Sequence, residues 1–180
     1  YNDCKITLDN CKDANTYIIL KNIAGDYNYG DLGEQTINAT VYSGGTIENC
    51  YGTITVADSS GNIEFHNVTL TINGLTANHT VNAVDSWLTF GAATTLSNIQ
   101  LRRGSLAGPS LTLISTSLID NSSINLPINT TGAKLTVRNS EIYGQITTRN
   151  IELINNQIYA VVDQADYGGV ITVLVSGNMF

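Results

Sequence analysis

Two stretches of the sequence share one pattern and begin 16 residues apart: Leu135–Ile142, which reads Leu-Thr-Val-Arg-Asn-Ser-Glu-Ile, and Ile151–Ile158, which reads Ile-Glu-Leu-Ile-Asn-Asn-Gln-Ile. Apolar residues alternate with other residues at the start of each stretch, which indicates a short β-strand with one buried face. The Asn that follows is a turn residue, because it tolerates left-handed backbone geometry and hydrogen-bonds to its own backbone. A unit this short cannot bury its apolar face alone, so copies must stack. The pattern therefore predicts a parallel β-solenoid.

Further copies of the pattern run through most of the chain. Clear copies begin at residues 6, 63 and 94, and looser ones at residues 45, 111 and 173. Copies in the second half start at uneven intervals, and the longer gaps before them have room for two coils each. Crossovers between parallel strands are right-handed in nearly all proteins. We therefore predict an all-β, single-stranded, right-handed parallel β-helix (solenoid) of about nine coils, one domain over residues 1–180. Neither end has a capping element, so we expect this domain to be an excerpt of a longer chain.

The same pattern predicts which residues point inward and which form turns. The alternation places six representative apolar side chains inside the solenoid: Ile63, Phe65, Leu96, Leu135, Val137 and Leu153. The turn residues should form a ladder of equivalent positions in their coils, though not all in adjacent coils, with Asn139 buried: Asn10, Asn67, Asn98, Asn139 and Asn155.

The composition argues against several kinds of binding partner. The net charge is −7 and the eight Lys and Arg residues are scattered, whereas a nucleic-acid-binding protein needs a basic patch or stripe. No apolar run approaches the roughly 20 residues that cross a bilayer. Cys4, Cys11 and Cys50 have no Cys-x-x-Cys spacing and no clustered His beside them. We expect no nucleic-acid partner, no membrane insertion, no metal and no cofactor.

One group of outward residues could carry chemistry. If the copies stack in register, Glu48 and Glu64 lie on neighbouring coils with His66 beside them and Asp9 not far away. Two carboxylates about 5–5.5 Å apart are the acid and nucleophile of retaining glycoside hydrolases, and their repulsion would raise one pKa. We therefore name Glu48, Glu64 and His66 as candidate catalytic residues. The alternative is that these side chains only keep an outer face hydrated.

Aromatic residues lie next to carboxylates in the segments between copies. Tyr27 and Tyr29 alternate with acidic residues in the longest of these segments, and Trp87 follows Asp85 in another. Aromatic faces beside carboxylates suit sugar rings, but Tyr and Trp are also common anchors of protein interfaces. Glycan contact and subunit contact therefore both stay open. The candidate glycan-binding residues are Asp9, Tyr27, Tyr29, Asp85 and Trp87.

The segments Leu-Thr-Val-Arg-Asn-Ser-Glu-Ile-Tyr-Gly and Ile-Glu-Leu-Ile-Asn-Asn-Gln-Ile-Tyr-Ala resemble the coils of right-handed parallel β-helices. That group includes pectate-lyase-like enzymes, bacteriophage tailspikes and some bacterial adhesins. The irregular coil lengths and the acidity are most similar to tailspikes and tail fibres. The Asp clusters and Arg that pectate lyases use with calcium are not matched.

The tailspike resemblance implies a homotrimer on the virion tail, extracellular, that binds and often depolymerises a cell-surface polysaccharide of the host. As an enzyme it would be a glycoside hydrolase or polysaccharide depolymerase. The alternative is a non-catalytic adhesin or structural rod on the bacterial cell surface. Fold alone does not choose between these functions, because function resides in the site.

Overall fold

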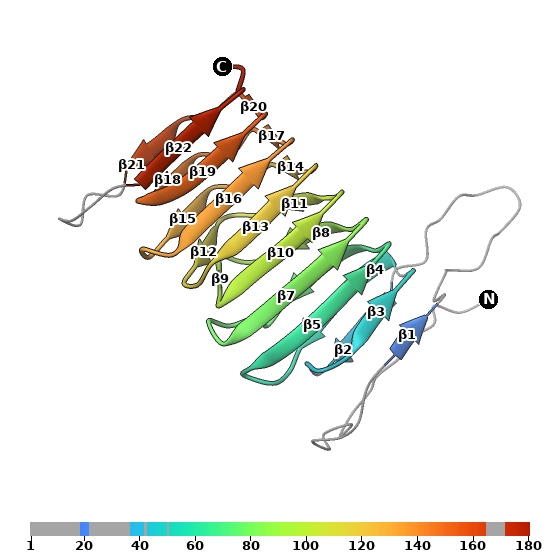
Figure 1. Cartoon of the computed structure of the whole chain (residues 1–180). Helices are drawn as coiled ribbons and strands as arrows, with labels where there is room; N and C mark the ends of the chain where they lie inside the picture. The colour runs from blue at the N-terminus through green and yellow to red at the C-terminus, as the bar shows by residue number, and fades with distance from the viewer. Residues whose placement is uncertain (1–18, 22–36, 42, 50, 165–171) are drawn as a thin grey trace, which may run out of the picture.

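The computed structural model of the protein describes residues 19–21, 37–41, 43–49, 51–164 and 172–180. All the secondary structure in these residues is β-strand and every strand pair is parallel, so the predicted parallel β-solenoid is confirmed (Figure 1). The chain makes about seven turns rather than the predicted nine. The strands stack into three sheets, which we name sheets A, B and C.

Each sheet collects one strand from successive coils. Sheet A has nine strands: β1 (Ile19–Lys21), β3 (Thr46–Glu48), β5 (Gly61–His66), β7 (His79–Val84), β10 (Asn98–Arg102), β13 (Ser117–Asp120), β16 (Lys134–Arg138), β19 (Asn150–Ile154) and β22 (Thr172–Ser176). Sheet B has eight: β2 (Ile37–Val41), β4 (Tyr51–Val56), β6 (Thr69–Asn73), β8 (Trp87–Phe90), β11 (Ser105–Ala107), β14 (Ser123–Ile124), β17 (Glu141–Ile142) and β20 (Gln157–Ile158). Sheet C has five: β9 (Thr94–Leu96), β12 (Leu111–Leu113), β15 (Ile128–Thr130), β18 (Ile146–Thr148) and β21 (Val162–Gln164).

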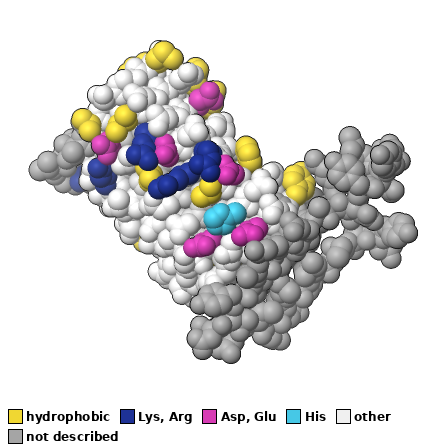
Figure 2. Space-filling view, turned by 45° about the vertical axis from the view of Figure 1, so that its right-hand side comes forward, with side chains coloured by type: hydrophobic (Ala, Val, Ile, Leu, Met, Phe, Trp, Pro, Cys, Tyr) yellow, Lys and Arg dark blue, Asp and Glu magenta, His cyan; other side chains and the backbone are white. Residues whose placement is uncertain are grey.

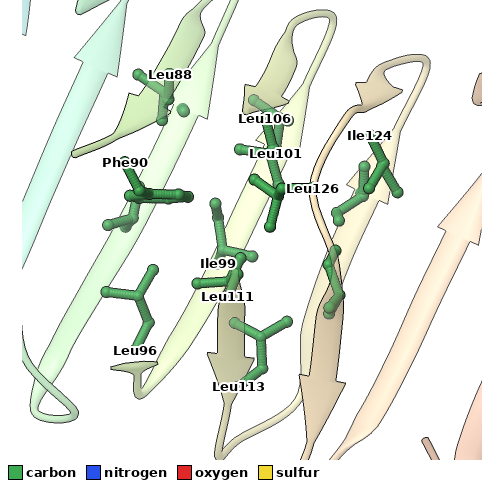
Figure 3. Packing of buried hydrophobic residues seen from close by; sticks show 14 of the residues in the cluster. Leu88, Phe90, Leu96, Ile99, Leu101, Leu106, Leu111, Leu113, Ile124 and Leu126 are labelled. Carbon is green, nitrogen blue, oxygen red and sulfur yellow. The ribbon is translucent and has the colours of Figure 1, made fainter. Parts of the chain in front are cut away.

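Apolar side chains from all three sheets fill the interior. Figure 3 shows leucine, isoleucine and phenylalanine side chains of successive coils packed in this core. The six side chains predicted to point inward are all at most 2% exposed, which confirms the alternation. Burying one such side chain stabilises the fold by about 1.5–3 kcal/mol. The stack therefore provides the stability that no single coil could have.

The coil repeat differs from the predicted one because two copies of the pattern belong to another sheet. The copies that begin at residues 94 and 111 form β9 and β12 of sheet C, not strands of sheet A. In sheet A the register pairs Glu64 with Asn82 and Asn82 with Gln100, at a constant separation. The same separation of 18 residues recurs in hydrogen bonds between neighbouring coils, such as the bond from Ser122 N–H to Ser140 Oγ. Because the predicted repeat combined strands of sheet A with strands of sheet C, the spacing between copies was uneven and the predicted number of coils was too high.

A column of left-handed residues marks the corner between sheets A and B. Asn67, Asn139 and Asn155 have φ of 52° to 54°, as the predicted ladder requires. Asn98 was predicted wrongly, because it is the first residue of β10, and Asn10 lies outside the described residues. The complete column of non-glycine residues in the described part of the chain is Asn49, Asn67, Asp85, Arg103, Asn121, Asn139 and Asn155.

The side chains that follow most of the left-handed positions in the described part of the chain point inward and form a second, buried column. Asn139 itself is exposed, so the prediction that it is buried was wrong. Buried polar side chains in this column include those of Ser122, Ser140 and Asn156. Asn156 Oδ1 accepts the N–H of Ser140 at 2.9 Å, and Asn156 Nδ2 donates to Val137 O at 2.9 Å. These bonds provide partners for backbone N–H and C=O groups that the turn leaves without a hydrogen bond to a neighbouring strand.

Candidate functional site

The predicted catalytic residues lie together on the outer face of sheet A. The register places Glu48 of β3 directly across from His66 of β5, while Glu64 lies across from Thr46. His66 Nε2 is 4.0 Å from Glu64 Oε2, and Thr46 Oγ1 donates to the same carboxylate oxygen at 3.3 Å. Figure 2 shows an exposed histidine flanked by acidic side chains on this face.

The two acids are diagonal neighbours rather than direct neighbours. One strand spacing combined with two residues along the strand puts their Cβ atoms about 8 Å apart. Two carboxyl groups separated by about 6.5–9.5 Å leave room for a water molecule, as in inverting glycosidases, whereas retaining enzymes need about 5–5.5 Å. A glutamate carboxyl lies about 4 Å beyond its Cβ atom on a flexible chain, so this register is compatible with either separation.

A band of ion pairs continues from this group along the corner of sheet A (Figure 2). Arg103 holds Asp85 through two bonds, Nε to Oδ1 at 2.7 Å and Nη2 to Oδ2 at 3.0 Å. The hydrogen bond from Arg103 lowers the pKa of Asp85. Arg138 Nη2 donates to Asp120 Oδ2 at 2.9 Å. Asp85, predicted to contact glycan, is thus already bound by a guanidinium.

The second predicted surface, around Trp87, lies on the outer face of sheet B. Trp87 begins β8 and is 50% exposed. Its column continues through successive coils as Ser105, Ser123 and Glu141. Three coil spacings separate Trp87 from Glu141, which is about 14 Å along the solenoid. Trp87 therefore stands at one end of a row of small polar side chains.

Two stacked tyrosines stand at the other end of that row. The rings of Tyr143 and Tyr159 are parallel to within 6°, with centroids 4.8 Å apart, and the side chains are 48% and 62% exposed. Tyr143 Oη donates to Glu141 Oε2 at 3.1 Å, and Tyr159 Oη donates to Gln157 Oε1 at 2.9 Å. The bond to Glu141 is the main cause of the raised pKa of Tyr143, which keeps the phenol neutral. These bonds fix both rings on the surface.

An open hollow of about 260 Å³ lies beside this row, where sheet B meets the corner with sheet A. Its lining is almost wholly polar: Gly104, Asn121, Ser122, Ser123, Asn139 and Glu141. Glycine is required at residue 104, because a Cβ there would lie 2.0 Å from the backbone oxygen of Ser86. The arrangement offers amide, hydroxyl and carboxylate groups, and the carboxylate is hydrogen-bonded to Tyr143.

Sequence reasoning missed the two tyrosines and the hollow. Tyr143 and Tyr159 each follow the last apolar residue of the two repeats that predicted the fold, so their recurrence was visible as a signal. The hollow depends on how Asn121 and Asn139 of one corner column meet Glu141 of sheet B. The positions of side chains from neighbouring coils relative to one another follow only from the register between whole coils. Asp9, Tyr27 and Tyr29 lie outside the described residues.

A buried histidine lies at a different corner, in the turns that precede sheet A. His79 is fully buried, its Nδ1 accepts the N–H of Thr76 at 2.9 Å, and its Nε2 lies 3.4 Å from Asp58 Oδ1. Asp58 also accepts hydrogen bonds from the backbone N–H and the hydroxyl of Ser43. Burial acts to raise the pKa of Asp58, but these hydrogen bonds outweigh it and lower the pKa. A Ser-His-Asp triad needs histidine between serine and carboxylate, so this group is a structural tie between coils.

The described part of the chain has neither a metal cluster nor a membrane helix. Within it, no group of three or more His, Cys, Asp or Glu side chains could hold a metal ion. The same residues include no helix long and apolar enough to cross a membrane. In comparisons with known proteins, the chain matches no family model, no curated protein and no solved structure.

Proposed function

We propose that this protein binds a cell-surface polysaccharide through the outer face of sheet B. The observation that carries the proposal is the row of small polar side chains bounded by Trp87 at one end and by the Tyr143–Tyr159 pair at the other. Aromatic side chains give large contact areas, and polar groups between them fix the orientation of a ligand. A solenoid repeats this surface every coil, which suits a polymer with repeating units.

The experiment uses the chain's single tryptophan. Titration with bacterial surface polysaccharides, followed by tryptophan fluorescence, should give a saturable change for a polysaccharide that binds. Trp87→Ala should weaken binding measured by calorimetry about tenfold or more, as expected for an aromatic anchor. Ile114→Ala is the matched control, because Ile114 is an exposed apolar residue that directly follows β12 of sheet C. Equal effects of the two substitutions would remove sheet B as the binding face.

A second candidate activity is hydrolysis of the bound polysaccharide by Glu48, Glu64 and His66. The exposed position of the two acids beside one histidine supports it. Glu48→Gln and Glu64→Gln should each abolish the release of reducing ends while binding persists. Glu152→Gln is the control, because Glu152 lies on the same sheet but is bound by Lys134 Nζ at 2.8 Å. If reducing ends are never released, the protein is the non-catalytic adhesin or rod.

The finer assignment that we propose is a bacteriophage tailspike or tail fibre, extracellular on the virion, with the bacterial cell surface as the alternative location. Such a protein would be a homotrimer with parallel axes. Sedimentation at micromolar concentration tests this assembly. A purely monomeric species would remove the trimer and weaken the tailspike assignment.

A further inference from the structure

The hollow next to Glu141 is lined by polar groups and carries one negative charge. The outward polar side chains of its lining are the amides of Asn121 and Asn139, the hydroxyl of Ser123 and one carboxylate, Glu141, because the buried Ser122 hydroxyl donates to Asp120 O instead. Among the described residues, no lysine, arginine or histidine lines it. The nearby guanidinium groups of Arg103 and Arg138 are held by Asp85 and Asp120. An anionic group that entered the hollow would therefore be repelled by the Glu141 carboxylate, and no positively charged side chain among the described lining residues would offset this repulsion.

Tyr143 adjoins the hollow through Glu141, because its hydroxyl donates to Glu141 Oε2 at 3.1 Å and Glu141 lines the hollow. Tyr159 covers one face of the Tyr143 ring. In the coil on the other side, Asn125 occupies the position equivalent to Tyr143, because Ile124 pairs with Ile142. Asn125 is shorter than a tyrosine and is tied to Ser123 through a 3.0 Å hydrogen bond. The side of the Tyr143 ring away from Tyr159 thus adjoins a space next to Ser123, where one further ring can continue the stack.

We propose that the hollow is a subsite for one uncharged pyranose unit, neutral or N-acetylated, stacked on Tyr143. The amides of Asn121 and Asn139 and the carboxylate of Glu141 supply donors and acceptors for its hydroxyls. Glu141 also excludes uronic acids, because a like charge brought against a fixed carboxylate is repelled. This inference rests on the proposed polysaccharide binding and adds the class of sugar that one site selects.

The test compares N-acetylglucosamine tetramers and glucose tetramers with galacturonic acid tetramers by calorimetry on the whole chain. We expect at least one uncharged oligosaccharide to bind, and galacturonate to bind about tenfold more weakly or not at all. Glu141→Gln keeps an acceptor for Tyr143 but removes the charge. It should weaken binding of the uncharged sugar, because a charge-assisted hydrogen bond becomes a neutral one, and it should bring the affinities for galacturonate and for the uncharged sugar within about threefold of each other.

A second substitution tests the location. Ser123→Tyr adds bulk on the outer face of β14 and should abolish binding of the uncharged oligosaccharide, and Ser123→Gln is used if the tyrosine variant does not fold. Two results would overturn the subsite and leave the proposed function standing. One is tighter binding of galacturonate than of uncharged sugars, and the other is an affinity for uncharged sugars that the substitution of Ser123 does not change. Failure of all oligosaccharides and of whole surface polysaccharides to bind would overturn both.

Discussion

Substitution of Asn139 tests whether the corner between sheets A and B depends on backbone geometry rather than on side-chain burial. Asn139 has φ of 52° and is exposed, and its side-chain amide donates a 3.1 Å hydrogen bond to Asp120 Oδ1. An ordinary L-residue in the left-handed region costs about 1–2 kcal/mol. Loss of one exposed hydrogen bond adds about 0.5 kcal/mol. Asn139→Ala and Asn139→Leu should therefore each lower the free energy of unfolding by about 1.5–2.5 kcal/mol.

Asn139→Gly separates the two contributions, because glycine adopts positive φ freely. It loses the hydrogen bond and adds chain entropy to the unfolded state, at a combined cost of about 1 kcal/mol. The expected order of stability in urea unfolding is Asn, then Gly, then Ala and Leu together. Asn125→Ala is the control, because Asn125 is also exposed and hydrogen-bonds a neighbouring side chain, Ser123, but lacks positive φ. If Gly is no better than Ala, or Asn125→Ala costs as much as Asn139→Ala, the geometric explanation is wrong.

Three further predictions concern other residues in the turns of the solenoid. Asn156→Leu should cost about 1–3 kcal/mol in unfolding experiments, because it leaves buried backbone groups without partners; an unchanged melting temperature would contradict this. Gly144→Ala should destabilise more than Gly132→Ala in thermal melts, because a Cβ at residue 144 would lie 2.0 Å from the backbone oxygen of Leu126, whereas at residue 132, with φ of 100°, the space is open and only backbone strain opposes the alanine. The lowered pKa of Asp58 means that its contribution to stability is present above the unfolded-state pKa and is lost as pH falls through the folded-state value. Asp58→Asn should therefore reduce the loss of stability as the solution is acidified, and an unaltered pH profile would exclude Asp58 as a source of acid lability.

The sequence was sufficient to predict the fold class and the inward face of the strands that it identified. Alternation identifies a buried face because the side-chain period of a strand does not depend on which sheet the strand joins. It was not sufficient to place every strand in a sheet. The copy that ends in Asn98 has the same pattern as the one that ends in Asn139, yet its strand, β9, belongs to sheet C. Local pattern records burial, whereas sheet membership depends on the length of each whole coil.

The candidate site shows the same limit more sharply. Glu48, Glu64 and His66 were expected close together, and the register places them so, because all three lie in strands that the pattern assigned to the same sheet. The hollow was not predictable in this way. Its lining combines Asn139 and Glu141 of one repeat with Asn121 and Ser123 of the preceding coil, and this combination needs the register between coils rather than the alternation within one strand.

The distribution of coil lengths explains why a binding surface would form at the corner between sheets A and B. From β5 to β20 two residues join the sheets there in every coil, for example between Arg102 and Ser105 and between Arg138 and Glu141. The corner between sheets C and A varies instead: β15 and β16 are separated by three residues, whereas β18 and β19 are separated by one. Because the variation falls at that other corner, sheets A and B stay in phase along the solenoid. Outward side chains at their shared corner therefore recur at one spacing of about 4.8 Å. A polymer lying along the axis would meet the same backbone geometry in each coil. Side chains that vary from coil to coil, such as Trp87, would then determine the coil at which each unit of the polymer binds.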